Sequence, residues 1–454
     1  MVTDIKHDRL TQLVIKHDDS IGIDTARARL ENAALVLYTD SAANSSWGQA
    51  AILTIAECAV RMFRGGVYLG SEFAEPAIIG NKTFITLRQM LVDAGCKTVT
   101  SPANAKALHV GIEANAPMGA LRCWADGWVA ITSPNSPSEL PLNGNEISGI
   151  LAGAMAVSEI FRQLVLGDVC ACKRTQKLSP LSPMNPMPVG IGLELLPKCC
   201  WILGLGNLGQ ATMWVLGLLP YSNPAEVELV LQDSDICGPE NLDIQILTKH
   251  AWLGHKKARM VAAWAEERGF QTIINERRFT DETKRTKMEP NLAFVGVDNL
   301  PTRRLATKAG FDLLIDAGLG ASAGEIFDVS IHSFPSEQKA EKIWADPVQQ
   351  ISKPLNASLE QHVKEGRLDA CGAMIIDGQS VGVPSTAVVA ATIQVAQACL
   401  AIAQGKYCDL IDLSLVSLRN TYTNEISLER VGVIQGAIGY IVPKVLQVQK
   451  VDAA

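Results

Sequence analysis

The chain has 454 residues, in which 40 Lys and Arg residues against 47 Asp and Glu residues give a formal net charge of −7. This acidic balance argues against broad, non-specific binding to nucleic acid, which requires a basic surface that displaces phosphate counterions. With 48% hydrophobic and 19% charged residues, the composition is that of a globular protein, and the length predicts about three domains, or two larger ones.

No pattern in the chain predicts export or insertion into a membrane. The first residues, MVTDIKHDRL, lack the apolar core and small residues of a secretory signal. The longest apolar stretch, Val381–Ala403, is interrupted by Pro384 and two glutamines, so we expect a buried helix and no contact with a membrane. Eleven cysteines without an export signal indicate reduced thiols, and we therefore expect a cytoplasmic protein.

In the first part of the chain, buried-type apolar runs alternate with helical stretches. The sequence predicts strands at Ala33–Tyr38, Ala107–Ile112 and Gly127–Thr132, and helices at Gln49–Phe63 and Ile147–Leu166.

Closely spaced prolines then forbid regular structure over Leu178–Gly192. We therefore predict a first half at residues 1–177, a Pro-rich linker at residues 178–195 and a second half at residues 196–454.

The second half repeats this outline with more elements. Its predicted elements are strands at Cys199–Gly206, Val227–Asp233, Leu292–Asp298, Asp312–Gly318 and Gly324–Phe334, and helices at Gln210–Leu219 and His255–Arg268. This alternation predicts an α/β fold in which each half has a mostly parallel sheet flanked by helices. A polar, irregular stretch at residues 335–370 is expected to cross over or cap part of the fold.

A glycine-rich loop, GLGNLG, lies between the first strand and the first helix of the second half. Gly204, Gly206 and Gly209 allow a tight turn and let backbone N–H groups at the helix N-terminus face a phosphate. Asp233 ends the second strand, where an acid would hold a ribose hydroxyl. Taken alone, these residues favour an NAD-dependent oxidoreductase.

The residues that follow favour different chemistry. A second acid, Asp235, is followed by an Asn-Leu-x-x-Gln element, a lysine at position 257 and an Asp-Asn step at Asp298. A nicotinamide enzyme has no need for this set. An adenylating enzyme must hold adenosine, neutralise a triphosphate with a lysine and place a magnesium ligand beside the reacting α-phosphate.

In this order the motifs resemble those of the adenylyltransferase family of ubiquitin-activating enzymes and their sulfur-carrier relatives ThiF and MoeB, over about residues 196–428. The resemblance implies Rossmann-like halves, ATP and Mg²⁺ as cofactors, and a set of site residues. These would be Gly204, Gly206 and Gly209 in the nucleotide loop, Asp233 and Asp235 at the nucleotide, Asn241 and Gln245 near the phosphates, Lys257 on the phosphates, Asp298 on magnesium, and Asp316–Gly318 with Gly324 in the substrate-side strands.

One departure from the family concerns a phosphate-contacting arginine. The family pattern is Asn-Leu-x-Arg-Gln, and this chain has Ile244 at the arginine position. In family members with two halves, the inactive half donates an arginine across the interface. Arg9, in DRLTQLVIK, resembles that N-terminal element, and the resemblance implies that it compensates.

The resemblance also gives a role to a cysteine. Cys371, in LDACGAMIIDG, occupies the position of the family's reactive cysteine. A thiolate there would attack the acyl-adenylate to give a thioester, although a buried structural cysteine is the alternative. Cys-Ala-Cys at Cys170 and adjacent cysteines at Cys199 are poor geometry for zinc, so no zinc is expected.

The first half resembles a degenerate copy of the second. Where the second half has its glycine loop, the first has TDSAANSSWG, residues 39–48, without the later motifs. The resemblance implies an inactive adenylation half, so that one chain builds an intramolecular pseudo-dimer.

A compact two-half chain of this kind resembles the bacterial activating enzymes of Bil antiphage operons. It implies ATP-dependent adenylation of the C-terminal glycine of a ubiquitin-like protein, capture on Cys371 as a thioester and transfer to a conjugating enzyme, in antiviral defence. The alternatives are an NAD-dependent oxidoreductase and a non-catalytic scaffold, which Ile244 favours. Taken singly, the motifs also have structural interpretations, such as a solvated lysine at Lys257 or a helix cap at Asp298 and Asn299.

Overall fold

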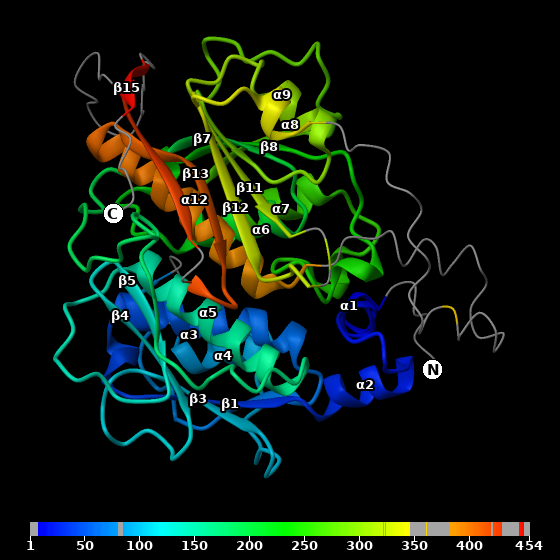
Figure 1. The fold of residues 1–454 in the computed structure, drawn as a ribbon, viewed down its shortest axis with the longest axis vertical. Coiled ribbons are helices and arrows are strands. Elements are labelled where there is room, and N and C mark those ends of the chain that lie inside the picture. The colour runs from blue at the N-terminus through cyan, green and yellow to red at the C-terminus, as the bar shows by residue number, and fades with distance from the viewer. Residues whose placement is uncertain are drawn as a thin grey trace.

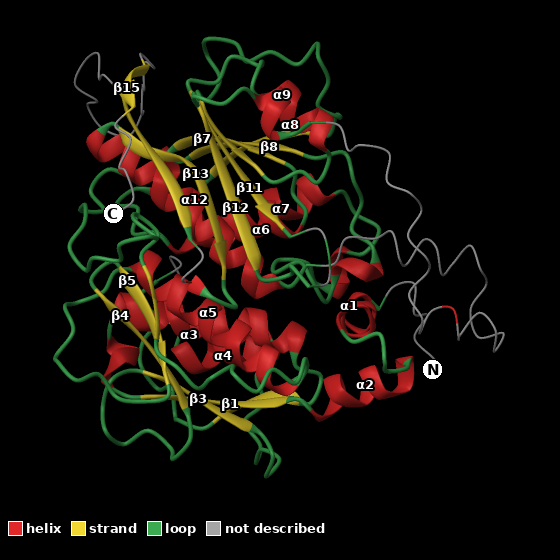
Figure 2. Ribbon diagram, viewed as in Figure 1, coloured by secondary structure: helices red, strands yellow, loops and turns green. Residues whose placement is uncertain are grey.

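The computed structural model describes residues 8–79, 85–320, 322, 324–345, 360, 382–418, 421–428 and 445–448. Within these residues, the chain forms two halves, each built on one sheet, with helices packed between the two sheets (Figures 1 and 2). The predicted α/β class is confirmed.

The first half has a six-stranded sheet in the order β2-β1-β3-β4-β5-β6 among the described residues. Its elements are α1 (Arg9–His17), α2 (Ile23–Asn32), β1 (Ala34–Thr39), η2 (Ser41–Asn44), α3 (Ser46–Met62), β2 (Gly66–Leu69), α4 (Leu87–Ala94), β3 (Lys106–Val110), β4 (Leu121–Asp126), β5 (Val129–Ser133), α5 (Glu146–Leu164) and β6 (Gln176–Leu178). The first four strands of this order are parallel, and β5 and β6 extend the sheet antiparallel.

The second half has a nine-stranded sheet in the order β15-β14-β13-β12-β11-β10-β7-β8-β9 among the described residues. Its elements are β7 (Cys199–Leu203), α6 (Asn207–Leu218), η3 (Pro224–Glu226), β8 (Glu228–Gln232), η4 (Pro239–Asn241), η5 (His250–Trp252), α7 (Lys257–Glu266), β9 (Gln271–Asn275), β10 (Leu292–Val295), α8 (Leu300–Ala306), β11 (Leu313–Leu319), β12 (Asp328–Phe334), α9 (Ala340–Ile343), α12 (Pro384–Gln404), β13 (Lys406–Ser414), β14 (Tyr422–Leu428) and β15 (Val445–Val448). Strands β7 to β11 pair in parallel, and β12 to β15 form an antiparallel extension.

The segment between the sheets, residues 179–198, contains neither a helix nor a strand. It is held against the β4–β5 turn, because the backbone N–H of Trp128 donates to Pro188 O over 2.9 Å and its indole Nε1 donates to Ile191 O over 2.8 Å. A proline-rich segment has few backbone N–H groups with which to join a sheet, so here its carbonyl groups accept hydrogen bonds from Trp128.

Four helices lie between the sheets: α3 and α5 from the first half, and α6 and α12 from the second (Figure 1). Their apolar side chains belong to one hydrophobic cluster that runs through both halves. Two buried hydrogen bonds cross it, from Trp214 Nε1 to Thr54 Oγ1 over 3.0 Å and from Ser158 Oγ to Ser385 Oγ over 2.8 Å. The halves therefore share one core, in agreement with an intramolecular pseudo-dimer.

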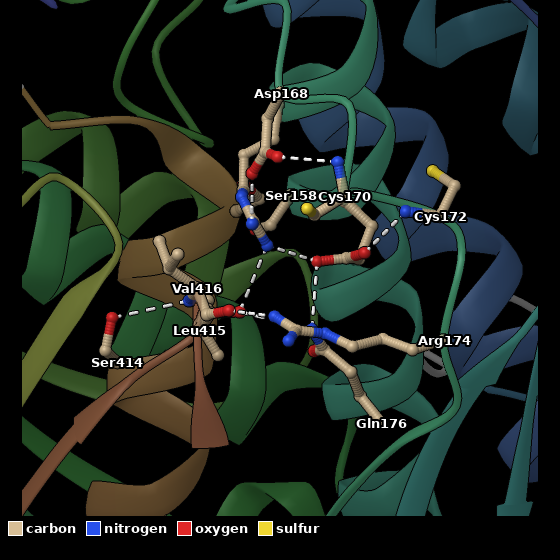
Figure 3. Close-up of polar contacts among 12 residues, drawn as sticks. Ser158, Asp168, Cys170, Cys172, Arg174, Gln176, Ser414, Leu415 and Val416 are labelled. Carbon is tan, nitrogen blue, oxygen red and sulfur yellow. Dashed lines mark hydrogen bonds and ion pairs between the residues drawn. The ribbon is translucent and has the colours of Figure 1, made fainter. Parts of the chain in front are cut away.

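A buried polar cluster joins the halves at the end of β13 (Figure 3). Arg162 of α5 forms ion pairs with Glu159 and Asp168 and donates to Leu415 O in the second half over 3.2 Å. Gln176 of β6 donates to Glu159 and to the same carbonyl. Arg162 is only 2% exposed, so this charge is compensated by partners from both halves.

Helix α12 is the one described helix that is long and apolar enough to cross a membrane by length and composition, and 89% of its most apolar window is buried in the fold. It packs against α5, α6 and the face of the large sheet. The expected buried helix over Val381–Ala403 is confirmed for its described part, and Pro384 stands in its first turn, where proline is tolerated.

Candidate functional site

The candidate site lies where the strand order of the second half changes direction. Strand β7 runs between β8 and β10, and the chain leaves β7 to one side and enters β10 from the other. The carboxyl ends of parallel strands at such a point form a crevice that binds ligands. The loop after β7 and the loop after β10 both end there.

The glycine loop has the conformation that a tight turn requires. Gly204 has φ +83°, and a Cβ on Gly209 would lie 1.8 Å from Gly204 O. Gly206 is the N-cap of α6, and within the described chain no side chain caps it. Among the described residues, a Cβ on Gly206 would meet no atom within 4 Å. A helix N-terminus without a side-chain cap leaves first-turn N–H groups that can bind an anion.

Asp233 follows β8 and contacts the glycine loop. Its carboxylate accepts from Leu205 N over 2.6 Å and from Asp235 N over 2.7 Å. This carboxylate fixes the loop and stands at the position where an acid binds ribose in related folds.

Lys257 begins α7 and is 7% exposed. Its Nζ lies 3.1 Å from Asp235 Oδ2, and its backbone N donates to Asp235 O over 3.0 Å. The Asp235 side chain is 63% exposed, so solvent or a ligand reaches this pair. The structure thus brings together Asp233, Asp235 and Lys257 beside the loop.

Asp298 follows β10 and is exposed at the same crevice. The adjacent Asn299 caps α8, because its Oδ1 accepts from Thr302 N over 3.0 Å. Asn299 therefore has the helix-capping role that was the structural alternative for the Asp-Asn step. Asp298 is not used in this cap, and its carboxylate stays exposed.

Arg303 supports this loop and was not identified from the sequence. Its Nε donates to Val297 O over 2.8 Å, and its Nη1 lies 3.0 Å from Asp316 Oδ2. It also donates to Ala317 O over 3.4 Å. Arg303 thereby ties the carboxyl ends of β10 and β11 together, directly below Asp298. Its spacing of five residues after Asp298 is the only signal in the sequence.

Asp316 is fully buried in β11, at the substrate-side strands of the prediction. Burial raises its pKa to about 7, and the charge of Arg303 acts in the opposite direction. Gly318 lies close to Arg303, since a Cβ there would be 3.1 Å from its Nη1. Gly324 lies in the β11–β12 connection.

Asn241 and Gln245 are buried and bonded within the protein. Asn241 Oδ1 accepts from Gly238 N over 2.9 Å. Gln245 Oε1 accepts from Gln210 Nε2 over 2.7 Å, and Gln210 Nε2 also reaches Leu205 O over 3.0 Å. Gln245 is thus linked to the glycine loop through Gln210.

Basic residues of the first half reach this region from across the interface. Arg61 Nε donates to Gln245 O over 3.1 Å. Arg9, on α1, lies within electrostatic range of Glu240: burial lowers the pKa of Arg9, and the Glu240 carboxylate acts in the opposite direction. The structure therefore places Arg9 beside the segment that contains Ile244.

The corresponding point of the first half is filled by the protein itself. Asp40 follows β1 in the same way that Gly204 follows β7. The Asp40 carboxylate accepts hydrogen bonds from Ala42 N over 2.8 Å and from Glu113 N over 2.7 Å. It also lies 3.1 Å from His109 Nε2. Burial works to raise the pKa of Asp40, but these hydrogen bonds outweigh it and hold the pKa below its usual value.

Helix α3 of the first half is also capped from within, because Ser45 Oγ accepts from Gly48 N over 3.1 Å. The first α-helix after the first strand therefore has a side-chain cap in the first half and none in the second. That only the second half binds a nucleotide stays a prediction.

Cys371 lies outside the described residues. Among the described cysteines Cys170 is exposed, Cys199 is half-buried, and Cys172 and Cys200 are buried. In the part of the chain that the structure describes, no group of three or more His, Cys, Asp or Glu side chains is placed to hold a metal ion. The absence of zinc remains a prediction.

Solved structures of limited similarity include the crystal structure of E. coli MccB, which matches 52% of this chain and 68% of that chain at 14% identity and a TM-score of 0.34. The crystal structure of E. coli MccB with ATP matches 50% of this chain and 64% of that chain, at 14% identity and a TM-score of 0.33.

Two family models match the chain, the BilD N-terminal domain over residues 33–180 and the BilD C-terminal domain over residues 196–405. The bacterial E1-like protein BilD from Collimonas sp. (strain OK412) is 32% identical over 417 residues, which cover 87% of this chain and 88% of the relative. This chain therefore belongs to the BilD family of bacterial E1-like proteins.

Proposed function

We propose that this protein adenylates the C-terminal glycine of a ubiquitin-like protein with MgATP, captures the product on Cys371 as a thioester and passes it to a conjugating enzyme. The observation that carries the first step is the glycine loop at the uncapped N-terminus of α6, which Asp233 links to Asp235 and so to Lys257. The family membership of the chain supports it.

The side chains at the crevice fit a nucleoside triphosphate. The open N–H groups of α6 suit phosphate oxygens, and the space around Gly206 leaves room for them. Lys257 places a positive charge at the first residue of α7. On nucleotide binding, its ammonium group would leave Asp235 and pair with a phosphate. Asp298 is an exposed oxygen ligand of the type that Mg²⁺ prefers.

Adenylation requires the substrate carboxylate to attack the α-phosphate, so that a C–O–P bond forms while the bond to the β-phosphate breaks and pyrophosphate leaves. Mg²⁺, held by Asp298, would neutralise charge on the phosphates. Lys257 and the α6 N–H groups stabilise the charge that develops on the phosphate oxygens. Arg303 holds the Val297 carbonyl and so fixes the approach of Asp298.

In the second step, the Cys371 thiolate attacks the acyl carbon and AMP leaves. A thioester keeps the acyl group reactive for transfer to the thiol of a conjugating enzyme. This step follows from the family resemblance around Cys371 and not from the described residues.

The test is an incubation of the protein with ATP, Mg²⁺ and a candidate ubiquitin-like protein, followed by a pyrophosphate assay and a non-reducing gel. We expect wild type to release pyrophosphate and to form a thiol-sensitive conjugate. Asp298→Ala should abolish both, and Cys371→Ala should abolish only the conjugate. Asp281→Ala, at an exposed acid outside the crevice, and Cys170→Ala, at the exposed cysteine, are the matched controls.

The two alternatives give different results. Tight NADH binding with no pyrophosphate release would support the oxidoreductase. Binding of a ubiquitin-like protein without pyrophosphate release would support the scaffold. Pyrophosphate release with no conjugate would show that the reaction stops at the acyl-adenylate and that no thioester forms on Cys371.

A further inference from the structure

An ionic network joins the N-terminal helix to the nucleotide segment of the second half. Asp8 caps α1, accepting from Thr11 N over 3.0 Å, and it is 3% exposed. Arg64, which follows α3, binds both oxygens of Asp8, at 2.5 and 3.2 Å. The same guanidinium reaches Asp243 Oδ2 over 3.1 Å. One arginine therefore bridges two acids that belong to different halves.

The network is buried enough to hold a fixed geometry. Burial works to raise the pKa of Asp8, but its contacts with Arg64 and Thr11 outweigh this and lower it. Charge-assisted hydrogen bonds of this kind are about twice as strong as neutral ones. Losing Arg64 would leave the buried Asp8 carboxylate with fewer partners.

Asp243 lies within the segment that contains Asn241 and Ile244, so the network reaches the predicted phosphate-binding segment. Asp243 precedes Ile244, the residue that stands in place of the family arginine, and follows Asn241 by two residues. Arg9 follows Asp8 directly, on the first turn of α1, and lies in electrostatic range of Glu240. The bridge thus fixes α1 beside the segment at residues 239–245, as Figure 1 shows for α1 and the neighbouring green segment.

We propose that Arg64 is a positioning residue that holds Arg9 of the first half at the nucleotide of the second half. Arg9 is the side chain that contacts the nucleotide, and Arg64 acts through it. This inference rests on the proposed function, because it requires ATP at the crevice. It also gives the first half a role in the chemistry of the second: it supplies the charge that Ile244 lacks.

The experiment is a double-mutant cycle on ATP affinity, measured by calorimetry with ATP and Mg²⁺ on the full chain. The variants are Arg64→Met, Arg9→Ala and the two together. We expect each single variant to weaken ATP binding about tenfold, as the loss of one charge-assisted contact would. The double variant should be no weaker than Arg9→Ala alone, because Arg64 has then nothing to position.

Two further variants separate this role from general stability. Asp243→Ala removes the acceptor through which Arg64 reaches the second half and leaves Asp8 and Arg64 paired. This variant should weaken ATP binding as much as Arg64→Met does. In the Arg9→Ala background it should cause no further loss of ATP affinity. Arg64→Lys should recover part of the affinity. Arg88→Met, on α4 of the first half, is the matched control and should bind ATP like wild type.

The outcomes are distinguishable. If wild type binds ATP and the effects of Arg64→Met and Arg9→Ala add, Arg64 does not act through Arg9 and the inference is wrong. If wild type binds ATP and Asp243→Ala has no effect, the bridge between the halves is not needed and the inference is again wrong. If wild type binds no ATP, the proposed function fails, and the inference fails with it.

Discussion

Trp214 of the second half donates its indole Nε1 to Thr54 Oγ1 of the first half over 3.0 Å, and both side chains are buried. This bond lies in the helical layer between the two sheets, within a hydrophobic cluster that includes residues of both halves. Because neither half can bury its helical face without the other, the two are expected to unfold as one unit.

Replacing Thr54 with valine should test this relationship. The variant keeps the shape of the side chain but leaves the Trp214 N–H buried without an acceptor, at a cost of about 1–3 kcal/mol in the free energy of unfolding. Urea denaturation followed by tryptophan fluorescence measures the cost. In a Trp214→Phe background the same change should cost much less, since no donor remains. Two separate transitions in wild type would contradict the shared core.

The glycine loop offers a prediction that separates folding from ligand binding. A Cβ at Gly209 would lie 1.8 Å from Gly204 O, so Gly209→Ala should lower both the melting temperature and ATP affinity. Gly206 has φ −76°, and a Cβ there meets no atom of the described residues within 4 Å. Gly206→Ala should therefore fold normally and still weaken ATP binding, because its methyl group enters the space that we assign to the phosphates. Normal ATP affinity in Gly206→Ala would place the nucleotide elsewhere.

Several parallel strands could be predicted because their centres are continuous apolar runs. Strands β1, β7 and β10 and the centre of β8, residues 229–231, are apolar segments that pair with parallel neighbours. The parallel strands β2, β4 and β9 were not predicted. Of the antiparallel strands, β5 and β12 overlap predicted strands, whereas β13 was not predicted, because it mixes buried and exposed residues. Their pairing depends on contacts that periodicity does not encode.

The site divides in the same way. Motifs that are local in the chain could be named from the sequence, the glycine loop from its spacing and Lys257 from the family resemblance. The contact of Arg64 with Asp243 joins residues 179 positions apart, so no local pattern predicts it. The self-capping of the first half by Asp40 was also invisible, since an aspartate after a strand has many structural roles.

The polar cluster at the end of β13 predicts a large loss of stability. In Arg162→Met, Glu159 would remain buried without its cation, which typically costs about 3–5 kcal/mol. Burial already raises the pKa of Glu159 even with Arg162 present. Adding Glu159→Gln should recover part of the loss, because a neutral amide remains instead of a carboxylate. Equal stability of the single and double variants, measured by urea denaturation, would show that the ion pair is not what stabilises this contact.

The buried Asp316 predicts how stability depends on pH. Its pKa is raised from 3.8 to about 7 in the folded protein, so between these values the folded chain binds a proton that the unfolded chain has released. The free energy of unfolding should therefore fall as pH rises through this window, by at most about 1.4 kcal/mol per pH unit. The contribution of Asp316 to the free energy of unfolding is fully present below pH 3.8, its pKa in the unfolded chain, and is lost as pH rises past about 7, its pKa in the folded protein.

Among the described residues, Arg303 from α8 pairs with Asp316, and His332 lies directly opposite Asp316 on β12. Burial lowers the pKa of His332, so His332 is mostly neutral where Asp316 titrates. Asp316→Asn should therefore flatten the pH dependence while leaving Arg303 bonded to Val297 O. The comparison is made by urea denaturation of wild type and variant between about pH 5 and pH 8. The same slope in both proteins would assign the pH dependence to groups other than Asp316, and would mean that its carboxylate stays charged beside Arg303 throughout this range.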